Sequence, residues 1–170
     1  NFFLSPLNLQ ESVEEQLMQK NRCLLLNWGP DLDFYDKHCV ISTGEEYVST
    51  GKEYRDYKTL IHAFQNNDNL KLAIYTCSYH VGTDYTSFEG KRYGNNIKFK
   101  IVNNDEMSFC ELARLSAKSK AIVIPILKEH LDYCIGLSSI ADSLALGKAI
   151  MVTNNRYHPI NVEELRCGCL

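Results

Sequence analysis

The spacing of apolar residues along the chain predicts alternating strands and helices. Short apolar runs with the length and composition of buried strands recur at residues 70–76, 97–102, 121–126 and 149–153. A further run at 39–42 ends at Thr43-Gly44 and predicts a first strand, which a polar loop over 45–54 follows. The order of these runs is typical of an α/β protein.

Helical periodicity separates the strands. Apolar residues fall on one helical face in the segments 57–64, 109–117 and 136–146. Asp56 and Asp105 are placed to cap the first two helices, and Gly147 follows the last turn of the third. Helices between apolar strands imply right-handed crossovers and a mostly parallel sheet. The pattern therefore predicts an α/β domain with a mostly parallel sheet.

The first part of the chain has a different pattern. Ser12-Val13-Glu14-Glu15 has the form of a capping box that opens a short helix, and a turn is expected after the leucines that precede Trp28. We divide the chain into a connecting segment, residues 1–38, and an α/β domain, residues 39–170.

Composition excludes several classes of protein. The chain has 170 residues, of which 45% are hydrophobic and 23% charged, which excludes a disordered chain or a disulfide mini-protein. The longest apolar run, 121–127, is far short of the ~20 residues of a membrane span. The net charge of −3 argues against a dedicated nucleic-acid binder.

Cysteine usage indicates a reducing compartment. The chain has 7 cysteines with scattered spacing, and it has no N-glycosylation sequon, so we expect a cytoplasmic protein. The pair Cys167 and Cys169 is a weak metal signal, and the histidines have no metal-ligand spacing, so no metal site is predicted. Because the chain starts at Asn1 without a signal-like segment and stops shortly after a loop, we expect it to be a piece of a longer protein.

The strongest candidate for chemistry is the start of the third helix. Ligands of open α/β sheets bind beyond the carboxyl ends of the strands. Gly136, Ser138 and Ser139 offer backbone N–H groups and hydroxyls to a phosphate, and Asp142 follows one turn later on the same face, in reach of a ribose. The same residues also fit a simple capping box, Ser139 with Asp142, which needs no ligand.

A second candidate lies after the first predicted strand. Gly44 allows close approach of a ligand, and Lys52 and Arg55 could bind phosphate oxygens. By composition alone, both basic residues also fit solvated loop charges. Three tyrosines of the long loop over 78–96 could stack on a sugar or a base, or simply hold the loop in place; they are Tyr79, Tyr85 and Tyr93.

Three segments in this order resemble the second domain of family 4-like glycosyltransferases of the GT-B fold. Residues 44–64 look like its first strand, basic loop and "Leu-Ile-x-Ala" helix. Residues 136–150, GLSSIADSLALGKAI, are similar to the family's G-small-small-E-A signature and are the most specific match. Residues 27–35, NWGPDLDFY, resemble the crossover between the two domains.

The resemblance implies a Rossmann-like, three-layer α/β/α sandwich with a mostly parallel sheet. This domain, residues 39–170, would be the half of a GT-B enzyme that binds a nucleotide-sugar donor. Arg55, Ser138 and Ser139 would meet the diphosphate, and Asp142 would take the place of the Glu that holds the ribose. Either Ile101 or Val102 would lie near the base.

Such enzymes transfer a sugar from a nucleotide diphosphate without an obligatory metal. The resemblance further implies that this transfer belongs to the biosynthesis of surface polysaccharide or of another glycan. The acceptor, a glycan or a lipid-linked sugar, would bind through an N-terminal domain outside this chain, which could also place the protein at the inner face of the membrane. The catalytic residues are not assigned.

Three positions depart from the family pattern. Glu45 stands where an Arg often follows the glycine, so that one phosphate contact is missing or is supplied elsewhere, for example by Lys52. Asp142 is one methylene shorter than Glu. The first acid of a Glu-x7-Glu pattern falls at Cys134, so that its sugar contact is absent or shifts to Asp132 or Glu129. Two alternatives therefore stay open: half of a sugar-nucleotide epimerase on the same fold, and a degenerate, non-catalytic α/β module that binds a partner.

Overall fold

A parallel sheet forms the centre of the protein. The computed structural model describes residues 1–80, 82–102 and 107–170. In these residues the sheet has the order β10-β9-β8-β3-β4-β7, and all its strands are parallel. The strands are β3 (Glu46–Thr50), β4 (Lys71–Thr76), β7 (Ile97–Ile101), β8 (Ala121–Ile124), β9 (Ala149–Val152) and β10 (Gly168–Cys169). Numbered along the chain this is the order 3-2-1-4-5-6 of a Rossmann fold, which confirms the predicted fold class.

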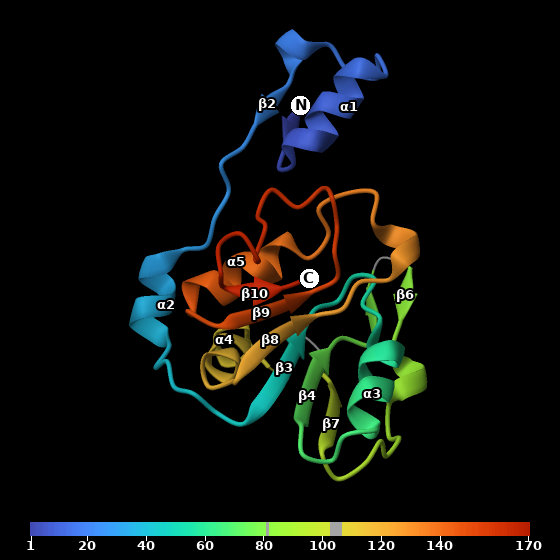
Figure 1. Ribbon diagram of the computed structural model, residues 1–170, viewed down its shortest axis with the longest axis vertical. Coiled ribbons are helices and arrows are strands. Elements are labelled where there is room, and N and C mark those ends of the chain that lie inside the picture. The colour runs from blue at the N-terminus through green and yellow to red at the C-terminus, as the bar shows by residue number, and fades with distance from the viewer. Residues whose placement is uncertain (81, 103–106) are drawn as a thin grey trace.

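Helices cover both faces of the sheet, as Figure 1 shows. Because side chains alternate along a strand, Leu72 and Ile74 pack with helix α3 (Tyr57–Gln65) on one face. Ala73 and Tyr75 point to the other face, where their cluster also includes Ile140 of helix α5 (Leu137–Ala145). Helix α4 (Phe109–Ala117) lies on the α5 side, since Leu112 and Leu115 pack against the same cluster.

Local signals account for the helix ends. Asp56 accepts a hydrogen bond from the backbone N–H of Thr59, as predicted for an N-cap. The cap of α4 is Ser108, which forms a capping box with Glu111, whereas the predicted cap, Asp105, lies outside the described residues. Gly147, with φ +58°, follows the last turn of α5.

The first strand is not where the apolar run predicted it. Residues 39–42 are not a strand, and Val40 is 79% exposed. Strand β3 instead occupies Glu46–Thr50, within the predicted polar loop. Its Ser49 is fully buried, and its hydroxyl donates a hydrogen bond to the carbonyl of Val123 at 2.7 Å, which offsets the cost of burying a polar group. A hydrogen-bonded serine thus takes a core position that an apolar count does not detect.

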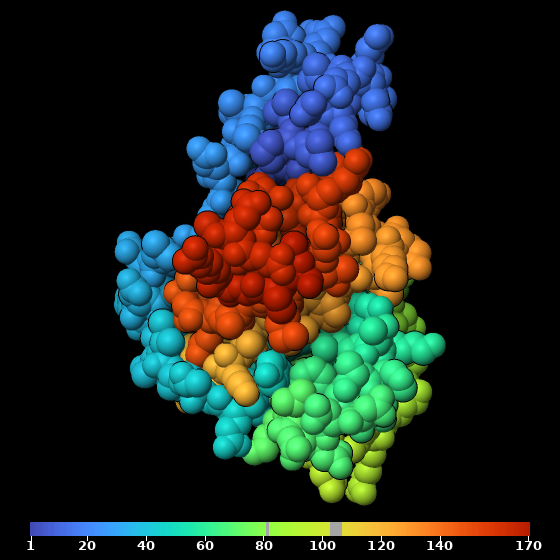
Figure 2. Space-filling model, viewed as in Figure 1, coloured from blue at the N-terminus to red at the C-terminus, as the bar shows by residue number. Residues whose placement is uncertain are grey.

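The N-terminal part forms a small unit at one end of the molecule (Figures 1 and 2). Strands β1 (Phe2–Phe3) and β2 (Leu24–Leu25) pair in parallel, next to helix α1 (Pro6–Glu14) and a 3-10 turn, Lys20–Arg22. The cap of α1 is Ser5, which accepts from the N–H of Asn8. The predicted capping box at 12–15 is therefore wrong: those residues end the helix rather than begin it.

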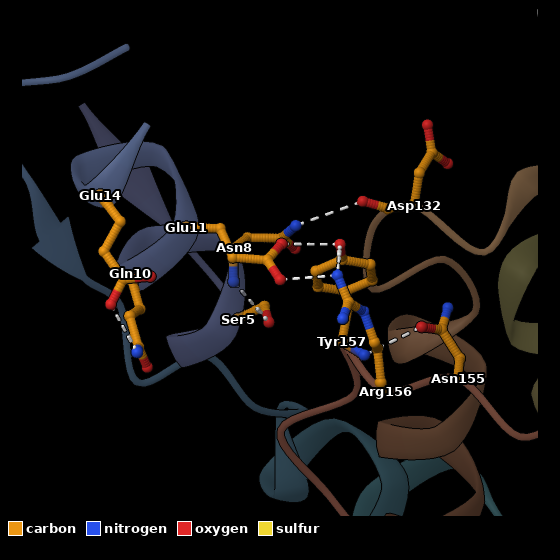
Figure 3. Close-up of polar contacts among 9 residues, drawn as sticks. All are labelled: Ser5, Asn8, Gln10, Glu11, Glu14, Asp132, Asn155, Arg156 and Tyr157. Atoms are coloured by element: carbon orange, nitrogen blue, oxygen red, sulfur yellow. Dashed lines mark hydrogen bonds and ion pairs between the residues drawn. The ribbon is translucent and has the colours of Figure 1, made fainter. Parts of the chain in front are cut away.

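Polar contacts attach α1 to the loops beside the sheet, as Figure 3 shows. Glu11 accepts from Arg156 at 2.6 Å and from the hydroxyl of Tyr157 at 2.7 Å. Asn8 donates to the carbonyl of Asp132 at 3.2 Å. These contacts place the N-terminal unit over the loop that precedes α5.

A second helix of the predicted connecting segment belongs to the sheet domain. Helix α2 (Leu32–His38) begins at the N-cap Asp31 and packs against α4. Its Tyr35 is 4% exposed and shares a buried cluster with Ala113, Ala117 and Leu146. This helix is thus anchored in the core of the domain rather than in a free linker.

The long loop after β4 contains local structure. It includes a hairpin of β5 (Tyr79–His80) and β6 (Thr83–Asp84) and a 3-10 turn, Thr86–Phe88; another 3-10 turn, Lys128–His130, precedes α5. Tyr85 and Tyr93 hold this loop in place, since both pack with the α3 cluster, while Tyr79 is exposed. Within the described residues, no helix has both the length and the apolar character needed to cross a membrane.

Candidate functional site

A cavity of about 430 Å³ opens beyond the carboxyl ends of β3, β4 and β7, beside the start of α5. It lies at the point where the strand order reverses, between β3 and β8, which is where Rossmann-like sheets bind ligands. Its size is within the range of small-molecule sites. All the predicted donor-site residues except Gly44 line it: Lys52, Arg55, Val102, Gly136, Ser138, Ser139 and Asp142.

Arg55 is a buried cation in the cavity wall. It is 5% exposed; its Nη1 donates to the carbonyl of Glu53 at 2.8 Å and its Nη2 to the hydroxyl of Ser139 at 3.1 Å. Within the described residues it has no carboxylate partner, and its buried Nε has no hydrogen-bond partner. Because an unpaired buried charge is costly, this side chain is poised to receive an anion.

The start of α5 faces the same space. Gly136 is the N-cap with φ +85°, a conformation that favours glycine, and its close neighbours are Ile124 and Ile126. Ser138 and Ser139 are in the first turn, where backbone N–H groups lack helical acceptors. The cap is Gly136, so the alternative reading of Ser139 and Asp142 as a capping box is wrong. Ser139 instead receives the hydrogen bond from Arg55.

Asp142 lies one turn further along α5 and also lines the cavity. The hydroxyl of Tyr35 donates to its Oδ1 at 2.5 Å. Burial raises the pKa of Asp142, and the hydrogen bond from Tyr35 opposes this effect by lowering it. The pKa of Tyr35 is in turn raised, first by burial and then by its bond to Asp142.

Gly44 is not part of the site, which corrects the sequence prediction. It precedes β3, at the opposite end of the strand, and a Cβ there would lie 2.1 Å from the carbonyl oxygen of Lys118. The glycine that follows the strand is Gly51, with φ +145°. Its carbonyl accepts from the hydroxyls of Tyr57 and Thr76, at 2.8 and 2.7 Å, and this fixes the turn that leads to Arg55.

Placing Gly51 at the strand end also removes one departure from the family pattern. The residue directly after this glycine is the basic Lys52, which lines the cavity. Glu45 lies before the strand and pairs with Lys71 on the surface. The signal that could have identified the strand was the aromatic and β-branched character of Tyr47, Val48 and Thr50 just before Gly51.

Besides Asp142, the cavity wall contains a carboxylate that the sequence did not suggest. Glu53 lines the cavity, and its Oε1 accepts from the hydroxyl of Tyr133 at 2.8 Å. The predicted substitutes for the missing acid, Asp132 and Glu129, are not among the lining residues, nor is Cys134. Burial raises the pKa of the Cys134 thiol, so it does not act as an acid at neutral pH.

Part of the cavity wall is apolar. Val102 lies there as predicted and is buried, and the sequence did not suggest its neighbours Met107, Phe109 and Leu112. Ile101, the alternative to Val102, is not among the lining residues. Apolar side chains together with a buried cation in one cavity suit a ligand that has both a flat ring and an anionic group.

The absence of a metal requirement stays a prediction. Among the residues that the structure describes, no group of three or more His, Cys, Asp or Glu side chains could hold a metal ion. Cys167 and Cys169 lie at the edge strand β10, where Cys167 bonds to a backbone carbonyl and Cys169 is exposed. The ring of His130 stacks on Tyr54 with centroids 3.5 Å apart.

Comparisons with known proteins identify the fold. No protein-family model and no curated protein matches this chain. Among solved structures, the chain is similar to TarM, a glycosyltransferase, with a TM-score of 0.59 and 10% sequence identity over 93% of this chain. It spans about 30% of TarM's own length. The comparison therefore shows a Rossmann-like α/β fold like that of one half of a GT-B glycosyltransferase.

Proposed function

We propose that this chain binds a nucleotide-sugar donor and is the donor-binding half of a glycosyltransferase. The observation that carries the proposal is Arg55: a buried guanidinium, without a carboxylate partner in the described residues, beside the start of α5 at the switch point of the sheet. A diphosphate would satisfy the cation and the free N–H groups of the helix together.

The rest of the cavity supports this ligand class. Asp142, one turn into α5, is placed to accept a hydrogen bond from a ribose hydroxyl. The apolar side chains that line the cavity, Val102 among them, suit a base. Glu53, beside Arg55, offers a carboxylate oxygen to the sugar of the donor. The match to family 4-like enzymes in residues 136–150 is independent support from the sequence.

Sugar transfer is part of the proposal as an activity of a longer protein, in which the acceptor, a glycan or lipid-linked sugar, binds outside this cavity. The α5 terminus and Arg55 would stabilise the charge that develops on the leaving diphosphate, through electrostatic preorganisation and without a metal. The alternative of a degenerate binding module loses support, because Glu45 no longer stands where the family has a basic residue.

The first experiment is calorimetric titration of the chain with UDP, GDP and ADP and with their common sugar conjugates, with and without Mg²⁺. We expect one nucleotide series to bind without Mg²⁺, and to raise the free energy of unfolding by about 2.7 kcal/mol at 100 times its Kd. Arg55→Gln should weaken binding at least about tenfold, since hydrogen bonds to charged groups contribute about 1.5–3 kcal/mol.

The matched control is Arg92→Gln, which removes an exposed arginine that does not line the cavity. Binding by Arg55→Gln equal to that of the wild type, or no binding by any nucleotide, would contradict the proposal. An epimerase half would bind the same ligands; it is distinguished by incubating the bound donor and looking for its epimer.

A further inference from the structure

Tyr35 connects a helix that is remote in sequence to the wall of the cavity. It lies 107 residues from Asp142, on α2, and its hydroxyl reaches the carboxylate at 2.5 Å. The side chain is 4% exposed, and its ring contacts Phe34 and Phe109 edge to face. Packing therefore determines where this hydroxyl lies, and the hydroxyl then restrains Asp142.

Asp142 depends on this contact. Tyr35 supplies the hydrogen bond that the structure shows for this carboxylate within the described residues. Burial favours the neutral acid, whereas the bond from Tyr35 favours the carboxylate. Without the hydroxyl, the Asp142 side chain would be free to rotate about χ1 and χ2 and would be harder to ionise, and either change makes it a poorer acceptor.

We propose that Tyr35 is a positioning residue for nucleotide binding, whose hydroxyl orients the Asp142 carboxylate to accept a hydrogen bond from a ribose hydroxyl. This inference rests on the proposed function. It assigns the preference for ribonucleotides to a residue of α2, in the segment that joins the N-terminal unit to the sheet domain. Because Arg55 contacts neither Tyr35 nor Asp142 through a hydrogen bond, phosphate binding is expected to be independent of Tyr35.

The test measures discrimination between sugars rather than affinity alone. The wild type, Tyr35→Phe and Asp142→Asn are titrated with UDP, GDP and ADP and with the 2′-deoxy and 3′-deoxy form of each. We expect the wild type to prefer the ribonucleotide at least about tenfold over one deoxy form. In Tyr35→Phe and Asp142→Asn this preference should fall below about threefold, while affinity for that deoxynucleotide stays within about twofold.

Tyr93→Phe is the matched control, because it removes a tyrosine hydroxyl that bonds to the carbonyl of Phe88 away from the cavity. It should keep the full preference for ribose. A loss of packing at Tyr35 would instead weaken both nucleotide forms equally, and that result would overturn the positioning role. Equal binding of ribo- and deoxynucleotides by the wild type would also overturn it, while the function proposed from Arg55 would stand.

If Tyr35→Phe does not fold, the wild type still tests the inference. The ¹³Cζ resonance of Tyr35 should shift on binding the ribonucleotide and not on binding its deoxy form, because only the former changes the carboxylate to which the hydroxyl is bonded. The same shift with both forms would contradict the inference. Absence of binding by every nucleotide would overturn the proposed function together with it.

Discussion

At the scale of single residues, the site is defined by a few side chains that are unfavourable for folding alone. Arg55 is a buried cation, Asp142 a buried carboxylate, and Gly51 has a φ of +145° that L-residues rarely adopt. Features of this kind persist where the surrounding structure maintains them, and they often occur at binding sites. Substitutions at Gly51 and at Asp142 test these costs.

Gly51→Ala should disturb Arg55 directly. A Cβ at position 51 would lie 2.5 Å from Nε and 2.8 Å from Cζ of Arg55, so the guanidinium must move away from Ser139. We expect a loss of about 1–3 kcal/mol in unfolding free energy from the backbone strain, measured by urea denaturation. Nucleotide affinity should fall with it.

The control for this variant is Gly90→Ala. Gly90 also has a positive φ, +69°, but a Cβ there would meet nothing within 4 Å. It should lose stability and keep the wild-type affinity. Equal affinities for Gly51→Ala and Gly90→Ala would show that the position of Arg55 does not depend on the space left by Gly51.

Asp142→Asn should be more stable than the wild type, and the difference in stability should grow as the pH rises. The pKa of Asp142 is raised in the folded state, so folding disfavours the ionised form. The free-energy cost of burying the Asp142 carboxylate is absent below the pKa of this group in the unfolded chain, about 4. The cost develops as the pH rises from that value through the pKa in the folded state. The urea midpoint of Asp142→Asn should therefore exceed that of the wild type at pH 7, and the difference should fade towards pH 4.

This gain should come with the weaker ribose preference described above, which would identify Asp142 as a residue kept for binding at the expense of stability. A midpoint for Asp142→Asn that is below the wild type at pH 7 would show instead that the bond between Tyr35 and Asp142 stabilises the fold.

At the scale of elements, helix α2 determines where the domain begins. The sequence predicted a connecting segment up to residue 38, but the structure packs Tyr35 of α2 against α4 and α5. The reason is tertiary: seven helical residues with two aromatic side chains have no strong pattern of their own, and their partners are more than 70 residues away in sequence. We therefore propose that the domain begins at Asp31, the N-cap of α2.

Two truncations test this boundary. A chain of residues 31–170 loses the exposed polar contacts of Glu11, which contribute little, and should keep both its fold and its nucleotide affinity. A chain of residues 39–170 also loses the burial of Tyr35, at a cost of at least about 2 kcal/mol, and should lose the preference for ribose. Thermal unfolding and titration of both chains would decide; equal behaviour would place α2 outside the domain.

At the scale of the whole molecule, strand order creates the site. Parallel strands in the order 3-2-1-4-5-6 bring the turn after β3, the start of α5 and the end of β7 to one opening. Residues from 50 to 142 line this cavity, in a chain whose overall fold is similar to that of TarM. The position of the cavity thus follows from topology, whereas its chemistry depends on Arg55, Asp142 and their neighbours.

Local periodicity by itself determined much of this protein. The strands β4, β7, β8 and β9 and the helices α3, α4 and α5 lie within a few residues of their predicted bounds, because apolar spacings of 2 and 3.6 residues are properties of the chain itself. The parallel sheet and the place of the α5 start at its ligand-binding edge followed from that alternation, whereas the role of Arg55 came from the family resemblance.

Only the tertiary structure decided the rest. It placed the first strand at Glu46–Thr50, where Ser49 is buried with a hydrogen bond from its hydroxyl to the carbonyl of Val123. The glycine at the candidate site is therefore Gly51 rather than Gly44. The tertiary structure also brought Tyr35 to Asp142. These features rest on contacts between residues far apart in sequence, and such contacts exist only once the sheet is assembled.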